Sequence, residues 1–265
     1  MEFLVFHNFQ LFAPVEIAGR KRWAHVDSGA TQDTAFGVYD GVEACEQEVL
    51  IRGAIKDMHH MKGRVRDVCF LGDALGDRDV TITDVPEYAD APFPVSMRIG
   101  APTLLSRPLL LDFKALRLGR DRLPEHYPRT TVPLELFRGI MLVELDLDGQ
   151  KLRTVVDTGA GMSVVNTAHL AEWRTPPEQV YEGEITDLTA TTMPVPVGCT
   201  RRLSLGGLVL ENCEHYMVDL SRAEAGLGTR IDVVLGLNTL LASSTVWYID
   251  PEAGRIEITT RGLPG

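Results

Sequence analysis

Cysteine is scarce in this sequence. Only four occur among 265 residues, at Cys45, Cys69, Cys199 and Cys213. No two of them have the C-x-x-C spacing typical of zinc sites and thioredoxin-like motifs, which excludes those two patterns. We expect buried thiols at these positions. The alternative is a disulfide between Cys199 and Cys213 across a hairpin, in an oxidising compartment.

Positive charge is also in deficit. The 26 Lys and Arg residues are outnumbered by 37 Asp and Glu residues, which gives a net charge of −11. Binding to the phosphates of a nucleic acid needs a basic face, so this balance argues against a nucleic-acid partner. A neutral or cationic substrate fits the charge better.

Long apolar runs are absent as well. No segment approaches the roughly 18 apolar residues of a membrane-spanning helix. The opening residues MEFLVFHNFQLF lack the basic stretch and the small-residue cleavage site of a secretory leader. We therefore expect a soluble, cytoplasmic chain with no membrane span, or a periplasmic or secreted one if a leader has been removed.

The sequence does contain one short motif twice. HVDSGATQDTAF begins at His25 and VVDTGAGMSVVN begins at Val155, so that Asp27 and Asp157 are 130 positions apart (157 − 27). At the same shift the preceding segments align, with a glycine eight residues before each aspartate. Repetition in register over this length predicts an internal duplication.

Further glycines repeat with the motif. RIGAPTLL and VLGLNTLL pair Gly100 with Gly236, a shift of 136 (236 − 100) that a loop insertion of six residues explains. Between these segments, Gly53 of LIRGAI falls opposite Gly183 of VYEGEI at the shift of 130. The register therefore holds through most of each half.

Local patterns predict an all-β fold. PVEIAG and LVELDLDG alternate apolar with polar residues and end at glycine, which is typical of a half-buried strand entering a hairpin. Short helices are expected only after Gly100, after Gly236 and near residues 167–173. The three prolines of residues 123–133 favour an extended connector outside the core. We place lobes at residues 1–122 and 134–265, with this connector between them.

The two motifs and the two glycine strands resemble those of the aspartic peptidases of the retropepsin and pepsin group. The resemblance implies a bilobal acid-protease fold, in which two duplicated retropepsin-like β-barrel lobes face each other across a pseudo-twofold axis. The first half departs from the second at two places. Residues 33–35 are Asp-Thr-Ala where residues 163–165 are Ser-Val-Val, and Arg98 stands where the second half has Val234.

The chemistry of such a pair explains why the motif should occur twice. Peptide hydrolysis by carboxyl groups needs one carboxylate to accept a proton from water and one carboxylic acid to polarise the scissile carbonyl. Asp27 and Asp157 are the predicted catalytic dyad. The resemblance implies that Ser28 and Thr158 support the dyad by hydrogen bonds between the lobes.

Glycines have three expected roles. Gly29 and Gly159 let each turn adopt unusual dihedral angles and bring backbone N–H groups near the carboxylates. Gly100 and Gly236 are expected to be packing glycines in the strands beside the dyad. Gly53 and Gly183 open candidate flap hairpins over the substrate, or are plain strand bends.

No metal site and no cofactor are predicted. His59 and His60 are adjacent, but no third ligand keeps a regular spacing to them, and a solvated loop is the expected location. Ala30 and Ala160 follow the motif glycines and cannot donate a side-chain hydrogen bond to the dyad. The pattern therefore predicts a mildly acidic optimum, roughly pH 4 to 6.5.

The sequence thus predicts an aspartic endopeptidase that acts as a monomer on a peptide or protein substrate. One alternative is a retropepsin-like pseudoprotease that binds extended peptides and cuts them weakly or not at all. A two-lobed ATPase of the actin and sugar-kinase type is disfavoured, because glycine-rich phosphate loops are absent and those chains are much longer.

Overall fold

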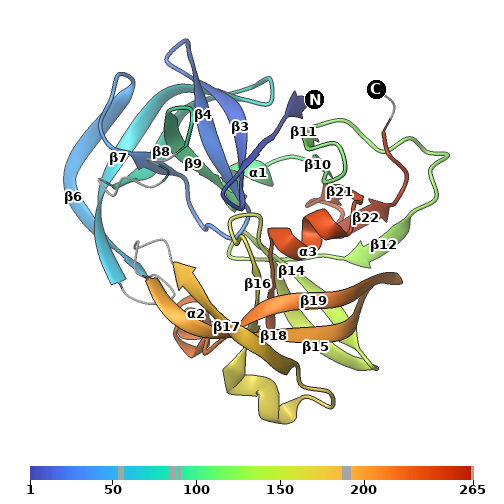
Figure 1. The fold of residues 1–265 in the computed structure, drawn as a ribbon. Helices are drawn as coiled ribbons and strands as arrows, with labels where there is room; N and C mark the ends of the chain where they lie inside the picture. The colour runs from blue at the N-terminus through green and yellow to red at the C-terminus, as the bar shows by residue number, and fades with distance from the viewer. Residues whose placement is uncertain (53–56, 84–87, 89–90, 187–191, 264–265) are drawn as a thin grey trace.

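A computed structural model describes residues 1–52, 57–83, 88, 91–186 and 192–263. Over these residues the strands form two eight-stranded sheets and one six-stranded sheet, and the helices are short (Figure 1). The all-β fold class is confirmed. The two large sheets are of similar size, as expected of a duplicated bilobal β fold.

One eight-stranded sheet forms the first lobe. Its strands, in spatial order, are β2 (Val5–His7), β3 (Gln10–Ile17), β4 (Arg20–Asp27), β9 (Val95–Gly100), β5 (Thr34–Phe36), β8 (Asp73–Thr83), β7 (Asp57–Phe70) and β6 (Val42–Arg52). An additional pairing of β3 with β7 curls the sheet back on itself. The antiparallel pairs are interrupted by a parallel pairing of β4 with β9, which brings the first Asp motif beside the strand of Gly100.

The other eight-stranded sheet forms the second lobe with the same strand order. Its strands are β13 (Glu135–Phe137), β14 (Ile140–Leu147), β15 (Gln150–Val156), β20 (Val233–Leu235), β16 (Ser163–Asn166), β19 (Leu208–Val218), β18 (Thr192–Leu205) and β17 (Glu178–Thr186). Here β14 pairs additionally with β18 and β15 runs parallel to β20, as β3 with β7 and β4 with β9 do in the first lobe. The two lobes therefore share one topology.

The core residues of the two lobes follow the same alternation. On β3 the buried side chains of one face are Leu11, Ala13, Val15 and Ile17, and on β14 they are Met141, Val143, Leu145 and Leu147; near the start of each strand, Phe12 and Leu142 of the other face are buried as well. Each residue of the second set lies 130 positions after one of the first. An alternation of period two buries one face of a strand and leaves the other for solvent, which is the reason that the sequence pattern identified these strands.

A six-stranded sheet joins the lobes. Its order is β1 (Glu2–Phe3), β11 (Arg117–Gly119), β10 (Leu109–Asp112), β21 (Val246–Asp250), β22 (Arg255–Thr259) and β12 (Thr130–Pro133). The central pairing is antiparallel between β10 and β21, one strand from each half. Both chain ends lie on this side of the molecule (Figure 1).

The connector prediction needs one correction. Residues 130–133 are not outside the packed structure, because they form β12 and pair with β22. Val132 and Leu123 are buried. The prolines indicated an extended chain, which is what the structure shows, but an extended segment with apolar side chains is also a strand in an edge position.

Helices are few and short in the described residues. α1 (Ala101–Leu104) and α3 (Leu237–Ala242) follow Gly100 and Gly236, and the 3₁₀ helix η1 spans Thr167–Glu172. All three were expected from the sequence. α2 (Ser221–Leu227) was not expected, and it forms part of the site described below.

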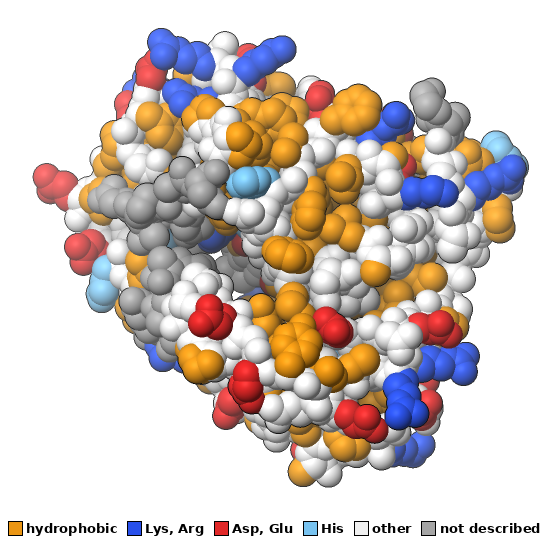
Figure 2. Space-filling model, viewed as in Figure 1, with side chains coloured by type: hydrophobic (Ala, Val, Ile, Leu, Met, Phe, Trp, Pro, Cys, Tyr) orange, Lys and Arg blue, Asp and Glu red, His pale blue; other side chains and the backbone are white. Residues whose placement is uncertain are grey.

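Two features of the described residues concern nucleic-acid binding and membrane insertion: the distribution of charge on the surface and the length of the helices. On the face shown in Figure 2, blue basic side chains stand in separate groups among red acidic ones. Over the described residues, the helices are all too short and too polar to cross a membrane.

Candidate active site

Each Asp motif lies at the end of a buried strand. β4 ends at Asp27, and β15 ends one residue before Asp157. Asp27 is in register with Gly100 of β9, and the backbone N–H of Asp157 donates to the carbonyl of Leu235, at 3.0 Å. The apolar strands fix both aspartates at the floor of a cleft between the lobes, where each carboxyl group remains partly accessible.

The motif glycines let each carboxyl group approach the opposite lobe. A Cβ atom added at Gly29 would lie 2.4 Å from Cγ of Asp157, and one added at Gly159 would lie 2.3 Å from Cγ of Asp27. Neither glycine has a positive φ. The expected reason, unusual dihedral angles, is therefore wrong: these positions need glycine because a carboxyl group occupies the space of a side chain.

Ser28 and Thr158 join the two turns by reciprocal hydrogen bonds. The Ser28 N–H donates to Oγ1 of Thr158 at 3.0 Å, and the Thr158 N–H donates to Oγ of Ser28 at 3.0 Å. The hydroxyl of Ser28 also donates to the carbonyl of Val156 at 2.9 Å, and that of Thr158 donates to the carbonyl of Val26 at 2.8 Å. These four buried bonds fix the separation of the turns.

Backbone N–H groups of each turn donate hydrogen bonds to the carboxyl group of that turn. Oδ1 of Asp27 accepts from the N–H groups of Gly29, at 3.0 Å, and Ala30, at 2.9 Å. Oδ1 of Asp157 accepts from the N–H of Gly159 at 2.8 Å. A side-chain hydrogen bond joins the carboxyl groups of Asp27 and Asp157 to each other.

The environment of Asp157 favours its protonated form. Burial, followed by the negative charge of Asp27, raises the pKa of Asp157 to about 7, against the opposing effect of the backbone donors of its own turn. Two carboxyl groups in contact cannot both ionise easily, so they share a proton. One group of the pair can therefore act as an acid while the other acts as a base.

The residues beside the dyad differ between the lobes. In the first lobe His25 of β4 is in register with Arg98 of β9, and in the second lobe Val155 is in register with Val234. Arg98 is 7% exposed, and its Nε lies 3.2 Å from Oδ2 of Asp27. An ion pair thus adjoins one aspartate, where two valines adjoin the other.

The buried histidines near this ion pair are held neutral. Burial, with a further contribution from Arg98, lowers the pKa of His25 to about 3, against the opposing charge of Asp27. Its Nδ1 is 2.8 Å from the hydroxyl of Tyr88. Burial and Arg98 also lower the pKa of His60. Sequence reasoning assigned His25 no role, although its place two residues before Asp27, opposite Val155, was a signal.

Gly100 and Gly236 lie against the motif loops. A Cβ atom at Gly100 would be 2.6 Å from the carbonyl oxygen of Gln32, and one at Gly236 would be 2.5 Å from the backbone of Met162. At both positions a side chain would clash with the backbone of the neighbouring motif loop.

The side chain that anchors each glycine strand differs between the lobes. In the second lobe the Gly236 N–H donates to Oγ of Ser163 at 3.0 Å. In the first lobe the Gly100 N–H donates to Oδ1 of Asp33 at 2.8 Å, and the Thr103 hydroxyl donates to its Oδ2 at 2.6 Å. Burial raises the pKa of Asp33, against these donors. The substitution of Asp33 for a serine thus preserves the hydrogen bond to the glycine strand.

The cleft above the dyad has a volume of about 960 Å³. Its first-lobe wall includes His7, Gln10, His25 and Arg98. Its second-lobe wall is mainly apolar and includes Ile140, Val155, Val164, Val218, Leu220, Leu227, Ile231 and Val234. The two sides of the dyad therefore present different chemistry to a ligand.

The two flap candidates have different outcomes. Gly53 lies outside the described residues. Gly183 lies within β17 and pairs with Val195 of β18, and the three residues that follow it, Glu184, Ile185 and Thr186, line the cleft. The β17–β18 hairpin therefore borders the cleft from the second lobe.

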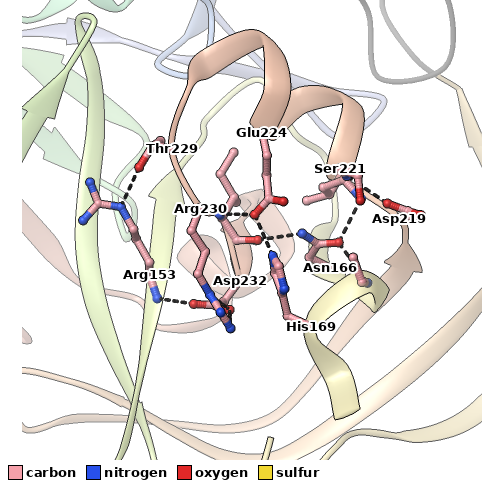
Figure 3. Close-up of polar contacts among 12 residues, drawn as sticks. Arg153, Asn166, His169, Asp219, Ser221, Glu224, Thr229, Arg230 and Asp232 are labelled. Atoms are coloured by element: carbon pink, nitrogen blue, oxygen red, sulfur yellow. Dashed lines mark hydrogen bonds and ion pairs between the residues drawn. The ribbon is translucent and has the colours of Figure 1, made fainter. Parts of the chain in front are cut away.

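A polar network holds α2 in the wall of the cleft (Figure 3). Glu224 of α2 accepts from the Ile231 N–H at 2.6 Å and is hydrogen-bonded to His169 at 2.8 Å. Asn166 donates to the carbonyl of Ile231 at 2.9 Å and accepts from the Leu220 N–H at 2.9 Å. Both chain segments that flank α2 are thereby tied to β16 and η1.

Sequence reasoning missed α2, although a signal was present. Gly228 follows the helix in a left-handed conformation, with φ of 79°, and a glycine after a short run of good helix formers marks a helix C-terminus.

The predictions for His59, His60 and the cysteines need correction. Both histidines lie in β7 and not in a solvated loop; His60 is buried, and His59 is exposed and paired with Glu48 at 3.6 Å. Among the described residues there is no group of three metal-ligating side chains. All four cysteines are free, and of the four expected buried thiols only Cys213 is buried, while Cys69 and Cys199 are half-buried and Cys45 is exposed.

The fold and the paired turns define a two-lobed β protein with facing aspartates at its centre. Residues 143–239 match the model of the aspartyl protease family. The matched segment contains Asp157 and Gly236 and lies within the second lobe, and it supports an aspartyl protease family and a peptidase-type enzyme for this chain. No curated protein matches the sequence.

Proposed function

We propose that this protein is a single-chain aspartic endopeptidase whose catalytic dyad is Asp27 and Asp157. One observation carries the proposal: each motif glycine leaves the space that the carboxyl group of the other lobe fills. A turn with a structural role alone would not need a carboxyl group of the other lobe so close to its glycine. Because one chain provides both aspartates, a monomer is sufficient for activity.

The dyad can perform hydrolysis with water alone. A water held between the carboxyl groups gives a proton to the ionised one as its oxygen bonds to the scissile carbonyl carbon, and the protonated carboxyl group gives its proton to the carbonyl oxygen. The first carboxyl group, which was ionised at the start and now carries the water proton, then protonates the amide nitrogen as the C–N bond breaks. A hydroxyl of the intermediate returns a proton to the second carboxyl group, which restores the starting state.

The cleft suits an extended peptide. The β17–β18 hairpin and the turn at Asn8 and Phe9 both line it, so that strand edges are available for main-chain hydrogen bonds. The apolar wall of the second lobe would hold a large apolar side chain beside Asp157. The polar wall beside Asp27 would hold a different side chain on the other side of the scissile bond.

A pseudoprotease is the second candidate function. The ion pair between Arg98 and Asp27 favours it, because a cation beside a catalytic carboxylate can prevent that carboxylate from accepting the proton of a water molecule. Such a protein would bind an extended peptide in the same cleft without cutting it. The fold is the same in both cases, so activity must decide between them.

The test is cleavage of a diverse peptide pool, analysed by mass spectrometry across a pH series. We expect cleavage by the wild type and a loss of at least about 10²-fold in kcat/KM for Asp27→Asn and for Asp157→Asn, since each carboxyl group acts in proton transfer. Asp40→Asn changes an exposed aspartate paired with Arg20 and is the matched control. Peptide binding without cleavage by the wild type would support the pseudoprotease and overturn the endopeptidase.

A further inference from the structure

The position that precedes the buried Ile-Gly or Leu-Gly pair carries a charge in one lobe and none in the other. In the second lobe it holds Val234, which lines the apolar wall of the cleft. In the first lobe it holds Arg98 on β9, a buried strand. Burying a guanidinium has a large desolvation cost unless a partner offsets it. A buried arginine at this point of a cleft therefore needs an explanation.

Asp27 is a partner of Arg98 among the described residues. Nε of Arg98 lies 3.2 Å from Oδ2 of Asp27, and both side chains are largely buried, at 9% and 14% exposed. The guanidinium also lies over the ring of Phe36, 5.8 Å from its centroid. At this distance and burial the attraction between the guanidinium and the carboxyl group is screened far less than at a surface.

In the part of the chain that the structure describes, the titratable groups next to the ion pair do not oppose that attraction. His25 and His60, from β4 and β7, are both held neutral, so neither adds a positive charge that would compete for Asp27. Tyr88 contributes a hydroxyl to His25. Asp157 faces Asp27 from the second lobe, where Val155 and Val164, both in register with Val234, stand in place of His25 and Thr34.

We propose that Arg98 is a positioning residue that keeps the single negative charge of the dyad on Asp27 and leaves the shared proton on Asp157. The proposal rests on the proposed function and assigns its two roles. Asp27 is the general base that accepts the proton of the attacking water, and Asp157 is the general acid that protonates the scissile carbonyl. The raised pKa of Asp157 is consistent with this assignment.

The consequence is that the pH range of activity extends to lower pH. Activity needs one proton on the dyad, so the acid limb of the rate profile marks the loss of the negative charge. A cation within 4–6 Å of a carboxylate usually lowers its titration by about 1 to 3 pH units. Arg98 should therefore preserve activity in mildly acidic solution, although the dyad is buried and lacks side-chain donors at Ala30 and Ala160.

The first experiment is the pH profile of kcat/KM on one good peptide for three variants. Arg98→Val copies the second lobe, and its acid limb should move up by about 1 to 3 pH units. Arg98→Lys keeps the charge and should keep most of the wild-type limb. Arg64→Val removes an exposed arginine paired with Asp79 and should leave the profile unchanged. An acid limb in Arg98→Val that coincides with that of the wild type would overturn the proposal.

A second experiment does not depend on turnover. Melting temperatures at pH 6 would be measured for Arg98→Val combined with Asp27→Asn and, separately, with Asp157→Asn. If the charge resides on Asp27, the first pair should be strongly non-additive and the second pair nearly additive, since asparagine resembles a protonated aspartate. The reverse pattern would place the charge on Asp157 and refute the assignment. Absence of peptide cleavage by the wild type would refute the proposed function alone.

Discussion

The two lobes share one strand order and one turn, yet they place different side chains around their aspartates. In the second lobe Val155, Val164 and Val234 are neighbours in register, and in the first lobe His25, Thr34 and Arg98 occupy the equivalent places. The backbone of the turns and the glycines is therefore what makes the dyad symmetric. The side chains one strand away make its two members chemically different.

This difference teaches which part of the site tolerates change. The two Asp turns leave no room for larger side chains, because each turn is packed against its counterpart in the other lobe. The flanking positions accept apolar or charged residues while the topology stays the same. Variants that alter the turns should thus affect both aspartates together, and variants that alter the flanks should affect one.

The largest effect is expected from adding a methyl group to a motif glycine. A Cβ at residue 159 would lie 2.3 Å from Cγ of Asp27, so Gly159→Ala must displace that carboxyl group. We expect a fall in kcat/KM of at least about 10²-fold, since misplacement by about 1 Å can have that effect. Gly29→Ala should behave in the same way, because it meets Asp157 at 2.4 Å.

A matched control for the glycine variants is Gly207→Ala, in the tight turn after β18, where the nearest atom to an added Cβ is 4.0 Å away. Its φ of 97° will lower stability without moving the dyad. Equal loss of activity in the control and in Gly159→Ala would show that general destabilisation, and not displacement of the carboxyl group, explains the result.

An intermediate effect is expected from breaking the hydrogen bonds between the turns. Ser28→Ala removes the acceptor of the Thr158 N–H and leaves that donor buried without its partner. An unsatisfied buried donor costs about 1 to 3 kcal/mol. Thr158→Val should lower the free energy of unfolding by a similar amount, because it leaves the Ser28 N–H unpaired. Denaturant unfolding measures both, and a large difference between the variants would mean that the turns are less symmetric than they look.

The last prediction concerns the dependence of stability on pH. Asp157 has a folded-state pKa of about 7, raised from an ordinary value of 3.8, so the folded protein binds more protons than the unfolded chain between these values. Its contribution to stability is complete below about pH 4 and is lost as the pH rises through 7. The slope is at most about 1.4 kcal/mol per pH unit.

Asp157→Asn should remove this slope, and a comparison of the two unfolding free energies at pH 4.5 and pH 7.5 measures it. The variant cannot ionise at this position, so its stability should change less over that interval. A decline in the variant as steep as that in the wild type would show that other groups cause the pH dependence.

The sequence was sufficient for the fold class and for the two turns. Asp27 and Asp157 were predicted because strand, aspartate and glycine lie within a few residues and repeat at a fixed shift. The alternation of β3 and β14 was equally local. Such features depend on the pattern of residues that are close together in the sequence, and a single sequence contains that pattern.

Contacts between distant segments were beyond a single sequence. Arg98 and Asp27 are 71 positions apart (98 − 27), and only the parallel register of β4 with β9 brings them together. The role of Gly159 depends on a carboxyl group of the other lobe, so its own turn gives no sign of it. The edge position of Thr130–Pro133 likewise depends on a partner strand near the C-terminus.

The six-stranded sheet has a consequence for folding. Its middle pair, β10 and β21, comes from different halves of the chain, and on either side of it each half adds two further strands. A half-chain on its own would leave Leu109–Asp112 or Val246–Asp250 as an open, largely apolar edge, and such edges recruit other strands. Each half on its own therefore has an exposed strand edge: when only the first 122 residues have left the ribosome, β10 lacks its partner, and the later strand β21 closes this edge.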